Sequence, residues 1–143
     1  GGYHSCGIRA DSTAECWGAN WEGQADAPEG AFTAIAAGGR HSCGIRADNT
    51  AECWGRNDFG QADAPAGAFT AISAGSSHSC GIRADSTVEC WGSSFWRANA
   101  PAGAFTAISA GSSHSCGIRA DGTAECWGWT TSLPAGVSWA SWS

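Results

Sequence analysis

The sequence contains no lysine and no methionine, and aliphatic side chains are scarce, with seven Ile, two Val and one Leu. So few large aliphatic residues exclude a generous hydrophobic core, and composition alone would favour disorder. Positive charge rests on seven arginines, which face thirteen acidic residues and leave a net charge of −6. Because binding to a phosphate backbone needs clustered positive charge, we expect no nucleic-acid partner and no attraction to anionic membranes.

Long apolar runs are also missing. No run approaches the roughly 20 residues that cross a bilayer as a helix, so no membrane span is expected. The chain shows no signal peptide and does not begin with Met, and we therefore expect a mature, processed product.

Tryptophan and cysteine are abundant instead, with nine and eight residues. Tryptophan buries a large area per residue, and disulfides restrict the unfolded chain, so both compensate for a thin core. An even number of regularly spaced cysteines is typical of an oxidising compartment. The expected localisation is therefore secreted, outside the cell.

One unit repeats four times. The segment His4–Asp11 recurs at 41–48, 78–85 and 114–121, at spacings of 37, 37 and 36 residues. Each copy continues into Glu-Cys-Trp-Gly, and Gly-Ala-Phe-Thr-Ala-Ile lies between copies. We expect a single repeat domain over 1–143, with repeats at about 1–30, 31–67, 68–103 and 104–136 and a terminal strand at 137–143 that completes the first repeat.

No stretch shows a helical stripe, which indicates an all-β fold. The alternation predicts three short strands per repeat, with bounds equivalent to Phe32–Ala36, His4–Arg9 and Thr13–Trp17.

A hairpin with a three-residue loop at 10–12 places Cys6 opposite Cys16. The third loop position needs a left-handed conformation, and Ser12, Asn49, Ser86 and Gly122 stand there. Arg9 and Glu15 then share the other face as a surface ion pair of little weight. One pairing rule must serve all four repeats, and it predicts disulfides Cys6–Cys16, Cys43–Cys53, Cys80–Cys90 and Cys116–Cys126.

The repeat resembles that of the RCC1 family. The matching segments are Phe-Thr-Ala-Ile-Ala-Ala-Gly at 32–38, His-Ser-Cys-Gly-Ile-Arg-Ala-Asp at 41–48 and Cys-Trp-Gly-Arg-Asn-Asp-Phe-Gly-Gln at 53–61. The short unit is similar to the bacterial-type repeats of the BLIP-II group. The resemblance implies β-propeller blades, here four short disulfide-pinned ones. The paired cysteines are additional to the family pattern, and the Gly-Gln ending at 23–24 and 60–61 is absent from the last two repeats. Charge and compartment oppose the chromatin binding and nucleotide exchange of the founding protein.

The two ends of the chain match in register. Residues 134–143 line up with 101–110 and stop where residue 1 would follow. The final strand therefore either closes a ring within the chain or docks on a second molecule in an open head-to-tail assembly. Trp139, Trp142 and Tyr3 are the candidate assembly residues. The competing interpretation is an intramolecular cap that fills a thin core.

The repeated polar residues favour structural roles over catalysis. Each histidine precedes a cysteine by two positions, but oxidised cysteines offer no thiolate to a metal, so we expect neither a metal site nor a cofactor. Catalysis needs one or two residues made special by their surroundings, whereas the Asp and Glu residues recur four times. We expect no catalytic residue and no enzymatic activity.

The segments after each Trp-Gly vary and carry aromatic residues. Loops on one side of a rigid β scaffold commonly bind ligands, and the candidates are Trp21, Phe59, Phe95, Trp96 and Trp129. Packing on neighbouring repeats is the alternative role. The leading hypothesis is a non-enzymatic extracellular scaffold that assembles with itself, as an oligomer or a filament. The second hypothesis is a lectin-like module that binds glycans, or an inhibitor-like module that binds another extracellular protein.

Overall fold

The fold comes from a computed structural model, which describes residues 2–92, 100–111 and 114–128. The described residues form strands joined by turns and loops, without a helix. The strands are β1 (His4–Ile8), β2 (Ala14–Gly18), β3 (Phe32–Ala37), β4 (His41–Arg46), β5 (Ala51–Gly55), β6 (Phe69–Ala74), β7 (His78–Arg83), β8 (Val88–Gly92), β9 (Phe105–Ala110), β10 (His114–Arg119) and β11 (Ala124–Gly128).

Each repeat contains the predicted hairpin. Cys6 lies directly opposite Cys16 in the β1–β2 pair, and the other repeats have the same register. The four predicted disulfides are confirmed, with Cα atoms 4.0–4.1 Å apart, the close spacing of a non-hydrogen-bonded pair. Each closes a short loop and contributes about 2–4 kcal/mol to the free energy of unfolding.

The predicted turn is confirmed as well. The third loop residue has φ of 72–74° at Ser12, Asn49 and Ser86 and 88° at Gly122. In the second repeat the Asp48 carboxylate accepts hydrogen bonds from the backbone N–H and the hydroxyl of Thr50, at 3.0 and 2.6 Å. The recurring aspartate thus stabilises the turn, and these bonds lower the pKa of Asp48.

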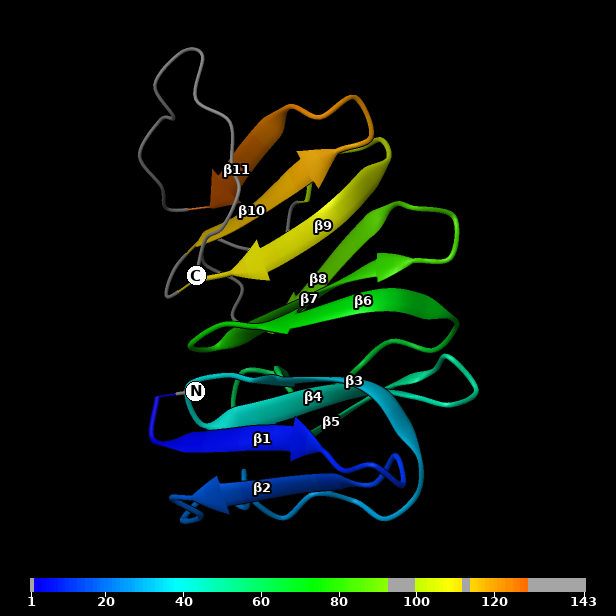
Figure 1. Ribbon diagram of the computed structural model, residues 1–143. Coiled ribbons are helices and arrows are strands. Elements are labelled where there is room, and N and C mark those ends of the chain that lie inside the picture. Colours follow the sequence, from blue (N-terminus) through cyan, green and yellow to red (C-terminus); the bar gives the residue numbers. More distant parts are fainter. Residues whose placement is uncertain (1, 93–99, 112–113, 129–143) are drawn as a thin grey trace.

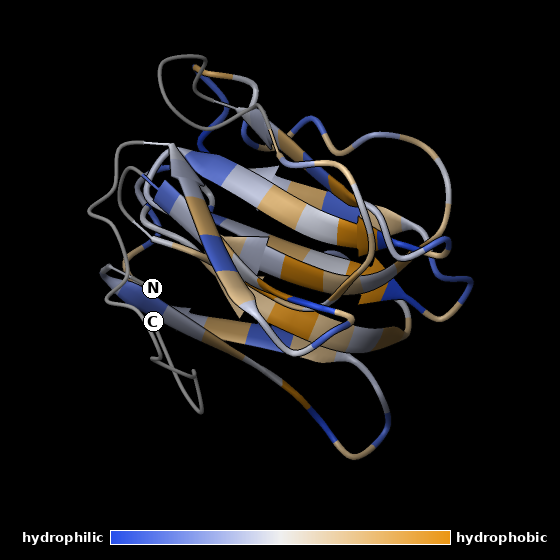
Figure 2. Cartoon of the chain, turned by 90° about the horizontal axis from the view of Figure 1, so that it is seen from above, coloured by the Kyte–Doolittle hydropathy of each residue, from blue (hydrophilic) through white to orange (hydrophobic). Residues whose placement is uncertain are grey.

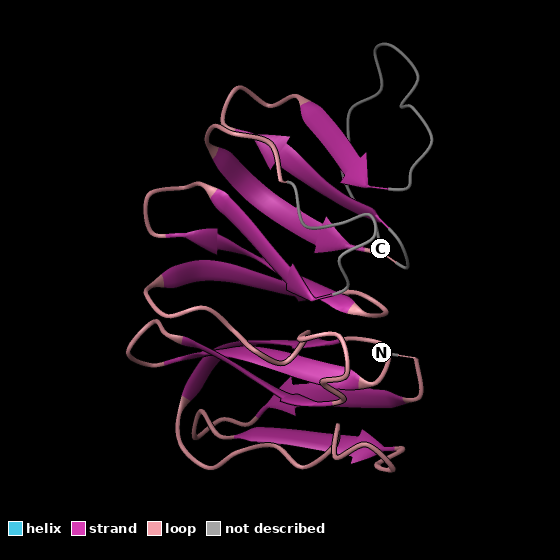
Figure 3. Cartoon of the chain, turned by 180° about the vertical axis from the view of Figure 1, so that it is seen from behind, coloured by secondary structure: helices cyan, strands magenta, loops and turns pink. Residues whose placement is uncertain are grey.

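The strands form four small antiparallel sheets, which we call blades 1 to 4 in chain order. Blades 2, 3 and 4 have three strands each, in the orders β3-β4-β5, β6-β7-β8 and β9-β10-β11, whereas the described part of blade 1 has only β1 and β2. The blades stack side by side in an arc, with β3, β6 and β9 as neighbours along its inner side (Figure 1; Figure 3 shows the same stack from behind). The all-β, blade-type fold is confirmed.

The hydrophobic core lies between the blades. Each blade has a disulfide face, which carries its two cysteines and the Ile of the His-Ser-Cys-Gly-Ile segment, and an aromatic face, which carries its Phe and Trp. Cys43 and Ile45 of blade 2 pack against Phe69 and Trp91 of blade 3. The same arrangement recurs where Ile82 of blade 3 meets blade 4. Figure 2 shows apolar residues within the strands and hydrophilic residues at several turns. One blade is therefore too thin to bury its own apolar residues, and neighbouring blades complete each other.

Candidate functional site

The repeated histidines join one blade to the next. His4 Nε2 lies 2.7 Å from Ser42 Oγ, and the same bond runs from His41 to Ser79 and from His78 to Ser115, at 2.8 and 2.9 Å. All three histidine side chains are buried. The sequence predicted a structural role for these residues, and the Nε2 partner of each is a serine hydroxyl of the following blade.

The Gly-Gln ending of a repeat reaches the next blade. The backbone carbonyl of Gln24 accepts hydrogen bonds from Ser42 Oγ and from Trp54 Nε1, both at 3.0 Å. Gln61 serves Ser79 and Trp91 in the same way. The third repeat has lost this ending, and the buried Trp127 Nε1 of blade 4 has no hydrogen-bond partner among the described residues. The Gly-Gln motif is therefore part of the blade interface.

The predicted Arg9–Glu15 surface pair is present, but the equivalent pairs of the other blades are less exposed. Arg9 pairs with Glu15 at the surface, but the Arg46 side chain is only 23% exposed where it pairs with Glu52. Its guanidinium also lies 4.4 Å from the centre of the Phe32 ring and donates to the Glu29 carbonyl. Arg83 and Arg119 do the same in blades 3 and 4. Sequence reasoning missed this role because the Phe strand is non-local to the hairpin.

Two of the predicted binding residues lie at the surface. Trp21 is 60% and Phe59 is 51% exposed. Trp21 packs on Tyr3, with ring centres 5.6 Å apart, and the Arg40 guanidinium lies 5.7 Å from the indole centre. The Arg56 guanidinium lies 5.8 Å from the centre of Phe59. The remaining candidates, Phe95, Trp96, Trp129, Trp139 and Trp142, lie outside the described residues.

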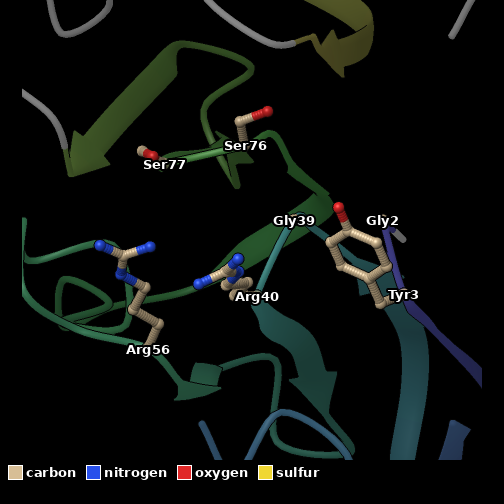
Figure 4. A pocket seen from close by; sticks show the side chains of 7 residues that line it. All are labelled: Gly2, Tyr3, Gly39, Arg40, Arg56, Ser76 and Ser77. Atoms are coloured by element: carbon tan, nitrogen blue, oxygen red, sulfur yellow. The ribbon is translucent and has the colours of Figure 1, made fainter. Parts of the chain in front are cut away.

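A pocket of about 460 Å³ opens beside these aromatic residues (Figure 4). It is lined by Gly2, Tyr3, Gly39, Arg40, Arg56, Ser76 and Ser77. Six of the seven occupy the two positions before the repeated histidine in blades 1, 2 and 3. These positions vary between repeats while the flanking residues do not, a signal that the search for aromatic loops overlooked.

The aromatic face of blade 1 is open at one end of the arc, and the disulfide face of blade 4 is partly covered at the other end. Trp17 on the aromatic face of blade 1 is 56% exposed, whereas its equivalents Trp54, Trp91 and Trp127 are 8–9% exposed. At the other end, Ile118 on the disulfide face of blade 4 is only half-buried. The sequence analysis named Tyr3, Trp139 and Trp142 as candidate assembly residues and did not single out Trp17, because the identical motif gave no sign of its exposure.

Within 2–92, 100–111 and 114–128, no three His, Cys, Asp or Glu side chains gather closely enough to hold a metal ion. The described residues also contain no helix that is long and apolar enough to cross a membrane.

Solved structures with a similar fold include two plant receptor ectodomains. The CRINKLY WD40 ectodomain of the Arabidopsis thaliana receptor kinase ACR4 is 29% identical, with a TM-score of 0.80 over 97% of this chain and 53% of that one. The ectodomain of the Physcomitrella patens receptor kinase CR4 is 31% identical, with a TM-score of 0.82 over 97% of this chain and 42% of that one. Yeast RCC1 (Prp20), solved bound to Kap60, is 19% identical, with a TM-score of 0.74 over 89% and 42%. The chain thus spans about half the length of these structures.

No curated protein sequence matches the chain. The family model of the regulator of chromosome condensation (RCC1) repeat, however, matches residues 32–61, 69–95 and 105–132. These segments make up more than half of the sequence, and they coincide with blades 2, 3 and 4 of the arc. The segments that match the family model are therefore the same segments that form the blades, and the chain belongs to the RCC1 repeat family.

Proposed function

We propose that this protein is a non-enzymatic, extracellular scaffold that assembles head to tail, the aromatic face of blade 1 of one copy receiving the disulfide face of blade 4 of a second copy. The observation that carries the proposal is the exposure of Trp17, 56% against 8–9% for the same residue in the other blades. Four disulfides and the likeness to receptor ectodomains support an extracellular location.

A second copy of the chain is the favoured partner for the exposed face of blade 1, because the contact between the two copies would repeat the contact between neighbouring blades within one chain. Disulfide faces meet aromatic faces inside the arc, each time with the same residue types. The end blades carry the residue types of the two halves of that interface. Trp17 is exposed on blade 1, and on blade 4 Ile118 is half-buried beside Cys116, which is buried. Two surfaces that differ but are complementary produce head-to-tail contacts, which close into a ring or extend into a filament.

Blade 1 offers a further reason for assembly. Among the described residues β1 has no inner strand, and a strand edge without a partner offers its backbone hydrogen-bonding groups to an added strand. The segment 137–143 lies outside the described residues but has the sequence register of that strand. Docking of this segment on β1 of a second copy would join the two chains by strand addition.

Light scattering coupled to size-exclusion chromatography tests the proposal over a range of protein concentrations. We expect a dimer or larger assembly for the native chain and a monomer for Trp17→Glu, because a buried unpaired carboxylate disfavours the contact. Trp21→Glu is the matched control, since Trp21 is equally exposed but lies on the pocket rim rather than on the end face. The control variant should assemble like the native chain.

A native chain that remains monomeric at all concentrations would overturn the proposal. So would an assembly that Trp17→Glu and Trp21→Glu disrupt to the same extent, because the contact would then not lie on the aromatic face of blade 1. Near-UV circular dichroism of each variant confirms that the fold is retained.

A further inference from the structure

The pocket between blades 1, 2 and 3 is a second feature, separate from the end faces. Tyr3, Arg40 and Ser77 occupy the same repeat position in three successive blades, directly before the histidine. Arg56 reaches the pocket from the segment that follows β5, and Figure 4 shows both guanidinium groups on the side of Ser76 and Ser77. Residues of three blades thus line one depression, with two guanidinium groups and three hydroxyl-bearing side chains among them.

The charge of this pocket is unusual for the molecule. Four of the described arginines are paired with the repeated glutamate of their own hairpin. Arg56 pairs with Asp58, at 2.5 Å, and that carboxylate is itself 46% exposed. Arg40 is the only arginine within the described ranges that has no carboxylate within ion-pair distance. In a chain of net charge −6, Arg40 therefore contributes an uncompensated positive charge beside Arg56, whose own charge is countered by Asp58 and by the nearby Glu22.

The exposed aromatic residues hold these arginines in place. The Arg40 guanidinium lies over the Trp21 ring and the Arg56 guanidinium lies over the Phe59 ring, each at cation–π distance. One face of each ring is therefore already covered by a guanidinium group. This arrangement argues against sugar stacking as the main role of Trp21 and Phe59, and it pre-organises the two cations beside the pocket.

We propose that this pocket binds a carboxylate of an acidic peptide segment, with Arg40 and Arg56 as the charged donors and Tyr3, Ser76 and Ser77 as hydroxyl partners. Planar guanidinium groups match the two oxygens of a carboxylate. The net negative charge of the whole chain repels polyanions such as nucleic acid or sulfated glycans. A single carboxylate interacts mainly with the charges close to the pocket, because the solvent ions screen the more distant ones. The volume of about 460 Å³ is sufficient for one acidic side chain with its flanking backbone.

NMR titration of the ¹⁵N-labelled full chain tests the assignment with two matched peptides, Ac-Ala-Glu-Ala-NH₂ and Ac-Ala-Gln-Ala-NH₂. We expect the amide signals of Ser76 and Ser77 to shift with the Glu peptide, at an affinity about tenfold higher than for the Gln peptide. Arg40→Gln should lower the Glu-peptide affinity about tenfold. Arg9→Gln is the control, because Arg9 is a surface arginine at the hairpin-turn end of its strand and is not among the pocket residues.

Equal affinity for the two peptides would overturn the proposal, as would unchanged affinity after Arg40→Gln. A second titration with glucuronate distinguishes a peptide from an acidic sugar, and tighter binding of glucuronate than of the Glu peptide would reject the peptide assignment. An Arg56→Gln variant supplies an independent arm if Arg40→Gln fails to fold, and it should also weaken Glu-peptide binding.

Discussion

At the scale of single residues, His41 links stability to pH. Its ring is fully buried between blades 2 and 3 and is bonded through Nε2 to Ser79. Burial, with smaller contributions from the nearby His78 and His4, lowers the pKa of His41 from 6.5 to about 4. The folded state therefore favours the neutral ring, and protonation of His41 destabilises it.

The sign of the pH dependence follows from this shift. Between pH 6.5 and 4 the unfolded chain binds the proton more readily than the folded chain, so the free energy of unfolding falls as the pH falls. We expect His41 to contribute a loss of about 3 kcal/mol between pH 7 and pH 4. Urea unfolding at several pH values measures it. His41→Asn should show a shallower decline than the native chain, and identical slopes would contradict the assignment.

At the scale of strands, two equivalent glycines should differ in their tolerance of a methyl group. A Cβ atom on Gly44 in β4 would lie 2.6 Å from Cδ1 of Phe32, which belongs to the inner strand of the same blade. A Cβ atom on Gly7 in β1 would meet only the Trp17 side chain, at 3.7 Å, because no described strand covers β1 on that side. The consequence of the same substitution therefore depends on whether an inner strand covers the position.

We expect Gly44→Ala to lower the free energy of unfolding by about 2 kcal/mol or more, because the Phe32 ring must move. Gly7→Ala should change it by less than about 0.5 kcal/mol. Chemical denaturation of both variants with intact disulfides gives the comparison. Similar costs at the two positions would mean that β1 is covered by an inner strand in solution.

At the scale of the whole molecule, the direction of assembly can be tested by mixing two variants. Trp17→Glu disables the aromatic face of blade 1, and Ile118→Asp disables the disulfide face of blade 4. Each variant alone should be monomeric. Their mixture should regain a dimer, because the intact aromatic face of the Ile118→Asp chain can receive the intact disulfide face of the Trp17→Glu chain. Analytical ultracentrifugation measures the recovery, and a mixture that remains monomeric would contradict head-to-tail contact.

Much of this organisation was predictable because it is local. The Cys6–Cys16 pairing and the left-handed turn at Ser12 follow from one hairpin whose cysteines lie ten positions apart, and both were confirmed. The contacts that cross between blades were not predictable from residue types. The bond from His41 to Ser79 spans 38 residues, and the approach of Arg40 to Trp21 depends on how two loops meet in space. The pocket was missed for the same reason, since its residues come from three repeats.

The placement of the disulfides has an evolutionary consequence. Every staple lies within one hairpin, between cysteines separated by 10 residues, and none joins one blade to another. Duplication or deletion of a whole repeat therefore adds or removes a complete pair and leaves no unpaired thiol to cross-link wrongly during oxidative folding. The number of blades can change in a single genetic event without rewiring the covalent framework, so such a chain can gain or lose length as readily as an uncrosslinked repeat protein.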